Sequence, residues 1–264
     1  MCQSSGKSHV WVKKQIYSVK ITSNFHLIKP RKVIIVCDTT YFGKRSEKTE
    51  LDGFMVFVDA LTGEVLWFKF LKNETNAGYQ EELNYLEGRG FEILGVVTDG
   101  RRGLANIFRN YPYQICLFHI QKGIRTLLTK NPKSEAGKNL HLINKTFIKD
   151  KLTKQEYLQK IKNHLETHQD YIRETTDLEP TNSSNQTKYK HIRHRKALRK
   201  IQTNLKYMFV FQDYPQLNIP KTTNHIDGGL FSPLKNLLRN HNGLSKDHRK
   251  TLIIQFCNSR GKTE

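Results

Sequence analysis

Five short apolar runs in the first half of the chain constrain its fold more than any other feature. Three follow one another closely, VIIVC at 33–37, FMVFVDA at 54–60 and EVLWFKF at 64–70. The other two, FEILGVVT at 91–98 and YQICLF at 113–118, alternate with stretches of helical spacing. Runs of this length are typical of buried strands. Their order predicts an α/β protein with a mixed five-stranded sheet flanked by helices.

Turn and helix signals separate these strands. Leu61, Thr62 and Gly63 predict a hairpin turn between the second and third strands. Residues 75–89 have helical spacing and end among glycines, which favours a helix. A short helix is expected at 101–110, and another from His119 to about Asn131–Pro132.

The second half of the chain is helical and basic in pattern. We divide the chain into a remnant of an N-terminal region at 1–30, a first core part at 31–130, a basic helical insertion at 131–220, and a returning helix at 221–264. A polar linker is expected at 175–187. The basic stretch at 188–207 carries one apolar stripe of Ile192, Ile201 and Leu205.

The charge of the chain indicates a polyanionic partner. Lys and Arg number 44 against 24 Asp and Glu, which gives a formal net charge of +20. Such an excess is most often matched by nucleic acid. The cysteines at 2, 37, 116 and 257 form no CxxC pair, and Cys37 and Cys116 are expected to be buried thiols. With no apolar run long enough for a membrane span, we expect a cytoplasmic, nucleoid-associated protein.

Three acids occupy positions that favour burial. Asp38 and Asp99 directly follow apolar strands, and Asp227 lies on the apolar stripe of the helix expected at 222–243. Each has an ordinary explanation, as a turn residue, an Asp-Gly turn or a helix-start acid. Together they predict a site for Mg²⁺ or Mn²⁺, with two ions, because carboxylate oxygens are the ligands that these cations prefer.

Four stretches carry a family resemblance. They are VCDTTYFG, NYLEGRGFEILGVVTDGRRGL, YPYQICLFHIQKG and TTNHIDGGLFSPLKNLLRNHNG, and they span about residues 33–243. In combination they resemble the Mutator-type DDE transposases of bacterial insertion sequences. The resemblance implies an RNase H-like fold interrupted by a helical insertion. It also implies metal-dependent cleavage and joining of double-stranded DNA at transposon ends and target DNA, by a homo-oligomer on DNA.

The resemblance also implies roles for particular residues. Asp38, Asp99 and Asp227 correspond to the three metal-binding catalytic acids, while Cys116 and His119 match a C-x2-H motif beside the site. His119 would assist catalysis and Cys116 would support it; the alternative is a helix-capping His beside a buried Cys. Basic residues expected near DNA phosphates are Arg101, Arg102, Lys188, Lys190, Arg193, Arg195, Lys196, Arg199 and Lys200.

Several departures from the family keep two alternatives open. The third acid is usually Glu, one methylene longer than Asp227, and Pro233 requires the helix to kink or to restart at Ser232. About 30 residues precede the first strand, where Cys2, Ser5 and Gly6 resemble the end of a metal-binding knuckle. One alternative is therefore a catalytically inactive, truncated transposase that binds DNA or an intact copy. The other is an RNase H-like nuclease.

Overall fold

The protein contains a mixed five-stranded sheet with the strand order β3-β2-β1-β4-β5. The computed structural model describes residues 8, 11, 21–42, 52–176, 189–241 and 243–260. The strands are β1 (Lys32–Tyr41), β2 (Gly53–Asp59), β3 (Val65–Leu71), β4 (Glu92–Thr98) and β5 (Tyr113–Ile115). β1, β2 and β3 pair antiparallel, whereas β4 and β5 pair parallel. This strand order is the RNase H-like topology, and the predicted fold class is confirmed.

Helices follow the strands in the predicted order. The described helices before the returning segment are η1 (Phe25–Leu27), α3 (Asn76–Gly88), α4 (Leu104–Ile107), α5 (Leu117–Leu128), α6 (Glu135–Lys149), α7 (Lys154–Thr167), α8 (Gln169–Arg173), α9 (Ile192–Met208), α10 (Val210–Asp213) and η3 (Pro215–Leu217). The returning segment contains α11 (Asn224–Ile226), the π-helical turn η4 (Asp227–Phe231), α12 (Ser232–Asn240) and α13 (Lys246–Asn258).

The chain forms two compact units. The first unit comprises residues 1–94 and 224–264, and the second comprises residues 95–223. The first unit therefore contains β1, β2, β3 and the returning helices, while the second contains β5 and the helices from α4 to α10.

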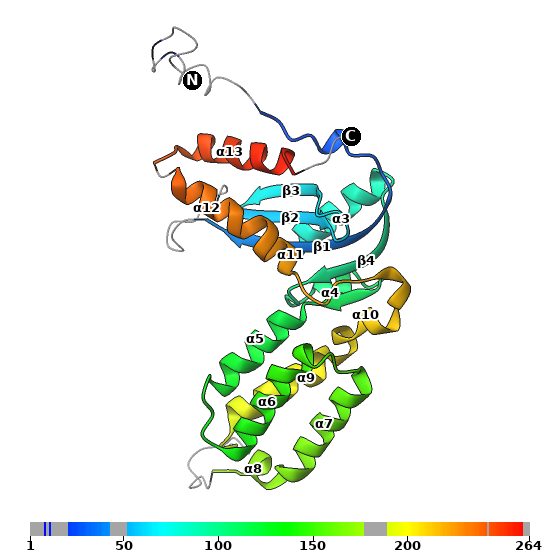
Figure 1. Ribbon diagram of the computed structural model, residues 1–264, viewed down its shortest axis with the longest axis vertical. Coiled ribbons are helices and arrows are strands. Elements are labelled where there is room, and N and C mark those ends of the chain that lie inside the picture. The colour runs from blue at the N-terminus through cyan, green and yellow to red at the C-terminus, as the bar shows by residue number, and fades with distance from the viewer. Residues whose placement is uncertain are drawn as a thin grey trace, which may run out of the picture. The chain divides into compact units, whose positions relative to one another are not determined.

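An aromatic cluster forms much of the core of the first unit. The ring centroid of Phe54 in β2 lies 5.3 Å from that of Phe68 in β3 and 6.4 Å from that of Phe231 in η4. All three side chains are buried. In Figure 1, α11 and α12 lie on the viewer's side of β1, β2 and β3. The cluster thus holds the returning helix against the sheet through hydrophobic burial.

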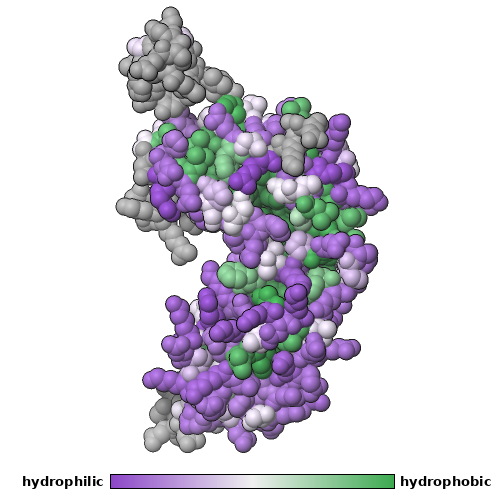
Figure 2. All heavy atoms as spheres, in the orientation of Figure 1, coloured by the Kyte–Doolittle hydropathy of each residue, from purple (hydrophilic) through white to green (hydrophobic). Residues whose placement is uncertain are grey.

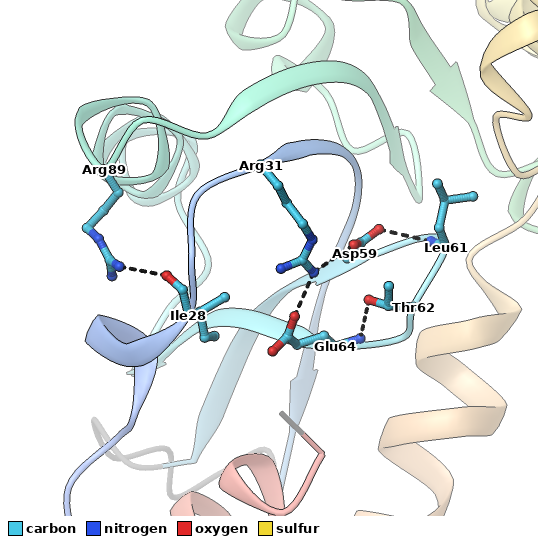
Figure 3. A network of polar contacts seen from close by, with 7 residues as sticks. All are labelled: Ile28, Arg31, Asp59, Leu61, Thr62, Glu64 and Arg89. Carbon is cyan, nitrogen blue, oxygen red and sulfur yellow. Dashed lines mark hydrogen bonds and ion pairs between the residues drawn. The ribbon is translucent and has the colours of Figure 1, made fainter. Parts of the chain in front are cut away.

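A polar network closes the hairpin between β2 and β3. The guanidinium of Arg31 donates to Asp59 Oδ2 at 2.8 Å and to Glu64 Oε2 at 2.6 Å (Figure 3). Gly63, at φ 74°, supplies the left-handed backbone that the turn requires, as the sequence predicted. Nearby, Arg89 donates to the carbonyl of Ile28 at 2.8 Å and fixes the approach to β1.

The second unit is mainly helical. α5 packs against α6 and α9, and α6 packs against α7. The ring of Tyr157 lies 5.1 Å from Phe147 and 5.5 Å from Phe209, between centroids. The buried amide of Gln114 joins β5 to this core, because it donates to Met208 O at 3.0 Å and accepts from Phe211 N at 3.1 Å. Hydrophilic residues cover most of the visible face of these helices (Figure 2).

β1 is longer than the sequence predicted. The expected strand ended at Cys37, with the following residues turning the chain away. Instead, the segment from Asp38 to Tyr41 continues the strand and pairs with the segment from Val56 back to Gly53. That part of the prediction is wrong because Thr and Tyr are favourable strand residues once a partner strand is beside them. Gly43 lies outside the described residues.

β5 is shorter than predicted, and the next helix begins earlier. The strand ends at Ile115, Cys116 is the N-cap residue of α5, and the helix starts at Leu117 rather than at His119. Helix α13 was not anticipated. Ile192, expected on the apolar stripe of α9, is 45% exposed, whereas Ala197 and Ile201 are buried. His194 is also buried. The buried face of α9 is therefore centred on His194, Ala197 and Ile201, and the predicted place of Ile192 on it is wrong.

Candidate functional site

Asp38 is a buried carboxylate inside β1. Only 9% of its surface is exposed, and it stands opposite Val56 in the antiparallel register with β2. Its Oδ1 accepts a hydrogen bond from Thr39 N at 2.7 Å. A strand paired along its length holds the position of this side chain rigidly, which suits a ligand better than a flexible turn does.

Asp227 begins the π-helical turn of the returning helix. The N–H of Ser232 donates to Asp227 O, five residues back, and α12 restarts at Ser232 with Pro233 in its first turn. This confirms the predicted response of the helix to Pro233, which has no N–H to donate. Turns of this kind recur at functional sites. Asp227 is half-buried, and α11, which directly precedes it, packs against β1.

Asp99 directly follows β4, as predicted. It is half-buried, and its Oδ1 accepts from Arg101 N at 2.9 Å. Gly100 has φ 83° and donates to Thr98 Oγ1 at 3.1 Å. The segment is therefore a tight Asp-Gly turn as well as the end of a buried strand, and a carboxylate in a turn of this kind is held in place by the backbone.

Cys116, His119 and Thr223 form a polar cluster in the second unit. Thr223 N and Thr223 Oγ1 donate to Cys116 Sγ at 3.2 Å and 3.4 Å. Burial raises the pKa of the Cys116 thiol, but hydrogen bonds with His119 and Thr223 outweigh this effect and lower the pKa below its ordinary value. His119 lies in the first turn of α5, whose N-cap residue is Cys116, and no side chain among the described residues caps this end of the helix. The sequence analysis missed Thr223, although it belongs to the TTNHID stretch.

Four of the predicted DNA-binding residues are engaged in contacts within the second unit. Lys190 pairs with Glu174 at 2.6 Å, and Arg193 donates to Thr126 O at 2.7 Å. Arg195 donates to Ile172 O at 3.0 Å, and its guanidinium lies 3.5 Å from the centroid of the Tyr189 ring. The Lys200 side chain lies against Gly123 of α5, where an added Cβ would come within 2.5 Å of its Cε.

Two basic side chains of α9 face solvent. Lys196 and Arg199 on α9 are exposed, and their side chains form no hydrogen bond or ion pair with any residue that the structure describes. Arg102 is exposed and Arg101 is half-buried. Lys188 lies outside the described residues. Lys196 and Arg199 are therefore the members of the basic stretch with the clearest capacity to bind an anion.

The three acids are divided between the two compact units. Asp38 and Asp227 belong to the first unit and Asp99 to the second. Within the described ranges, no group of three or more His, Cys, Asp or Glu side chains could hold a metal ion. The chemistry of the three carboxylates nevertheless suits Mg²⁺ or Mn²⁺, which prefer oxygen ligands.

The strand order defines an α/β protein of RNase H-like topology. Comparison with models of known protein families, with curated proteins and with solved structures finds no match. No helix in the described part of the chain is long and apolar enough to cross a membrane.

Proposed function

We propose that this protein is a DDE transposase catalytic domain, which cleaves and joins DNA strands with Mg²⁺ or Mn²⁺. The observation that carries the proposal is the strand order β3-β2-β1-β4-β5 with one acid on β1 and another directly after β4. A third acid, Asp227, starts a π-helical turn in the helix that returns to the sheet. The resemblance of the four sequence stretches to Mutator-type transposases supports the same conclusion.

In this proposal, Asp38, Asp99 and Asp227 bind the metal ions, and each acid contributes from a defined element. Asp38 supplies a buried carboxylate from a strand that is paired with β2, and carboxylate oxygens are the ligands that Mg²⁺ and Mn²⁺ prefer. When bound, the metal ions would activate the attacking oxygen and stabilise the leaving oxygen of the phosphodiester. His119 would orient a phosphate or a ligand, held in turn by Cys116.

The proposed partner is double-stranded DNA, at transposon ends and target sites, bound by a homo-oligomer near the nucleoid. The net charge of +20 supports a polyanionic partner. Exposed Lys196 and Arg199 would contact backbone phosphates without reading the base sequence.

Nicking of a supercoiled plasmid tests the proposal. The wild-type chain is expected to nick in the presence of Mg²⁺ or Mn²⁺, and Asp227→Asn is expected to abolish nicking while DNA binding stays nearly intact. Asp247→Asn, an exposed acid on α13 of the same unit, is the matched control and should retain activity. Mn²⁺ binding by calorimetry gives a second readout, which Asp38→Asn should weaken. Equal nicking by wild type and Asp227→Asn would contradict the assignment.

An inactive transposase is the second candidate, because Asp227 stands where the family usually has Glu. The shorter side chain displaces a carboxylate in a centre whose geometry tolerates little displacement. Asp227→Glu separates the two candidates. If the wild type is inactive and Asp227→Glu nicks DNA, the chain is a decayed transposase that still binds DNA.

A further inference from the structure

An open groove lies along α8 and α9 in the second unit. It has a volume of about 700 Å³ and lies entirely within residues 172–202. Its apolar part is made by Ile172 of α8 with Ile192 and Leu198 of α9. We refer to it as the α8–α9 groove.

The edge of the groove is cationic. Lys196 and Arg199 lie one turn apart on α9, and both are exposed. None of the described residues that line the groove is acidic. Since neither side chain is hydrogen-bonded or ion-paired to a described residue, both can neutralise an anion without breaking a contact within the described part of the unit. Charge complementarity therefore favours an anionic occupant.

The apolar part of the groove narrows the choice of anion. Ile192 is 45% exposed, directly beside the cations, where burial by a ligand would be favourable. Tyr189 adds an aromatic ring, held in place by the Arg195 guanidinium at 3.5 Å. Duplex DNA keeps its bases stacked inside and can satisfy only the cations. An unpaired strand can satisfy the cations with its phosphates and cover the apolar surface with a base.

We propose that the α8–α9 groove binds an unpaired stretch of DNA, with phosphates at Lys196 and Arg199 and a base against Ile192. This inference rests on the proposed function, because it takes DNA as the ligand. It goes further by assigning to α9 a preference for single-stranded over duplex DNA, as expected where strands are separated at a cleavage site.

Fluorescence anisotropy without divalent metal tests the groove independently of cleavage. The probes are labelled oligothymidylate of about 12 nucleotides, within the range of single-strand sites, and a duplex of the same length. The wild type is expected to bind oligothymidylate more tightly. Ile192→Gln, at an exposed position, removes apolar area that the base would bury, so it should weaken single-strand binding about tenfold and leave duplex binding unchanged.

Lys196→Ala with Arg199→Ala tests the cationic edge. Loss of two phosphate contacts should reduce the salt slope of oligothymidylate binding by about 1.4. The control is Lys160→Ala with Lys162→Ala on α7, which removes the same charge from exposed positions outside the groove. Circular dichroism verifies that each variant is folded.

Three results would overturn the inference. The first is an unchanged single-strand affinity in Ile192→Gln, and the second is an equal loss of affinity in the groove and α7 double variants. The third is a groove that binds an acidic amphipathic peptide but does not bind oligothymidylate. Failure of the proposed function is distinguishable from these results. If the chain binds oligothymidylate through Ile192 but never nicks plasmid, the inference about the groove is supported and the proposed enzymatic function is contradicted.

Discussion

The Nε2 atoms of His164 and His194 lie 3.0 Å apart, and both imidazoles are buried. His164 Nδ1 lies 2.7 Å from Asn139 Oδ1, an acceptor, so Nδ1 carries the proton and Nε2 is left to accept. His194 Nε2 then donates to His164 Nε2. This chain of hydrogen bonds joins α6, α7 and α9, and the rings of His168 and Tyr171 lie against it.

The histidine pair predicts a loss of stability in acid. Burial, together with the charge of nearby His168 and other histidines, lowers the pKa of His164 and of His194 to about 4, from an ordinary value of 6.5. The unfolded chain therefore binds more protons between these pH values. The contribution of these histidines to the free energy of unfolding is full above pH 6.5. It falls as the pH drops toward 4, by about 1.4 kcal/mol per pH unit for each extra proton that the unfolded chain binds.

His194→Gln tests this prediction, because Gln keeps an N–H donor for His164 and cannot titrate. In urea unfolding followed by helical circular dichroism, the variant should lose less stability than wild type between pH 6.5 and 4.5. His26→Gln, at an exposed position in η1, serves as the control and should follow the wild type. Parallel pH curves for all three proteins would contradict the prediction.

Glu82 predicts the opposite dependence in the first unit. Burial raises the pKa of Glu82 to about 7, against the effect of Lys69, whose Nζ lies 3.3 Å from Glu82 Oε1. The folded state thus holds a proton that the unfolded state releases above about pH 4.5. The contribution of protonated Glu82 to the free energy of unfolding is therefore full below pH 4.5 and is lost as the pH rises through 7.

Glu82→Gln should remove that loss, so its stability relative to wild type should increase from pH 5 to pH 8. The difference from wild type isolates Glu82 from the histidine pair, which titrates equally in both proteins. Glu81→Gln is the matched control, since the neighbouring side chain is 62% exposed and also contacts Lys69. A constant difference across this pH range would show that Glu82 does not titrate as predicted.

Removal of the Arg31 side chain is predicted to lower the free energy of unfolding substantially. It faces two carboxylates, Asp59 and Glu64, whose side chains are only 3% and 9% exposed. Arg31→Ala leaves both without their partner and should cost about 2 kcal/mol of unfolding free energy, reduced from the fully buried case because Arg31 is 34% exposed. Urea unfolding at pH 7 measures this cost.

The adjacent residue provides the control for Arg31. Lys32 pairs with Glu92 at 3.2 Å, but both side chains are more than half exposed. Lys32→Ala should therefore cost less than about 0.5 kcal/mol. Similar costs for the two substitutions would mean that the Arg31 network contributes little.

The sequence by itself determined the number and order of the strands and the sheet class, but not the ends of β1 and β5. Each apolar run must leave water, and a run of five to eight residues does so most readily as a strand. The end of β4 before Asp99, the helix at 76–88 and the restart of the helix at Ser232 follow from apolar length, glycine positions and the chemistry of proline.

Only the tertiary structure decided which groups meet. β1 extends through Asp38 because β2 offers backbone partners down to Gly53, and no local pattern in residues 38–41 specifies a partner strand. The sequence does not distinguish the basic residues of α9 from one another. In the structure, the side chains of Arg193, Arg195 and Lys200 contact α5 or α8, whereas those of Lys196 and Arg199 remain exposed. Local sequence sets the tendency of a residue to be buried or charged, whereas its partners come from segments far away along the chain.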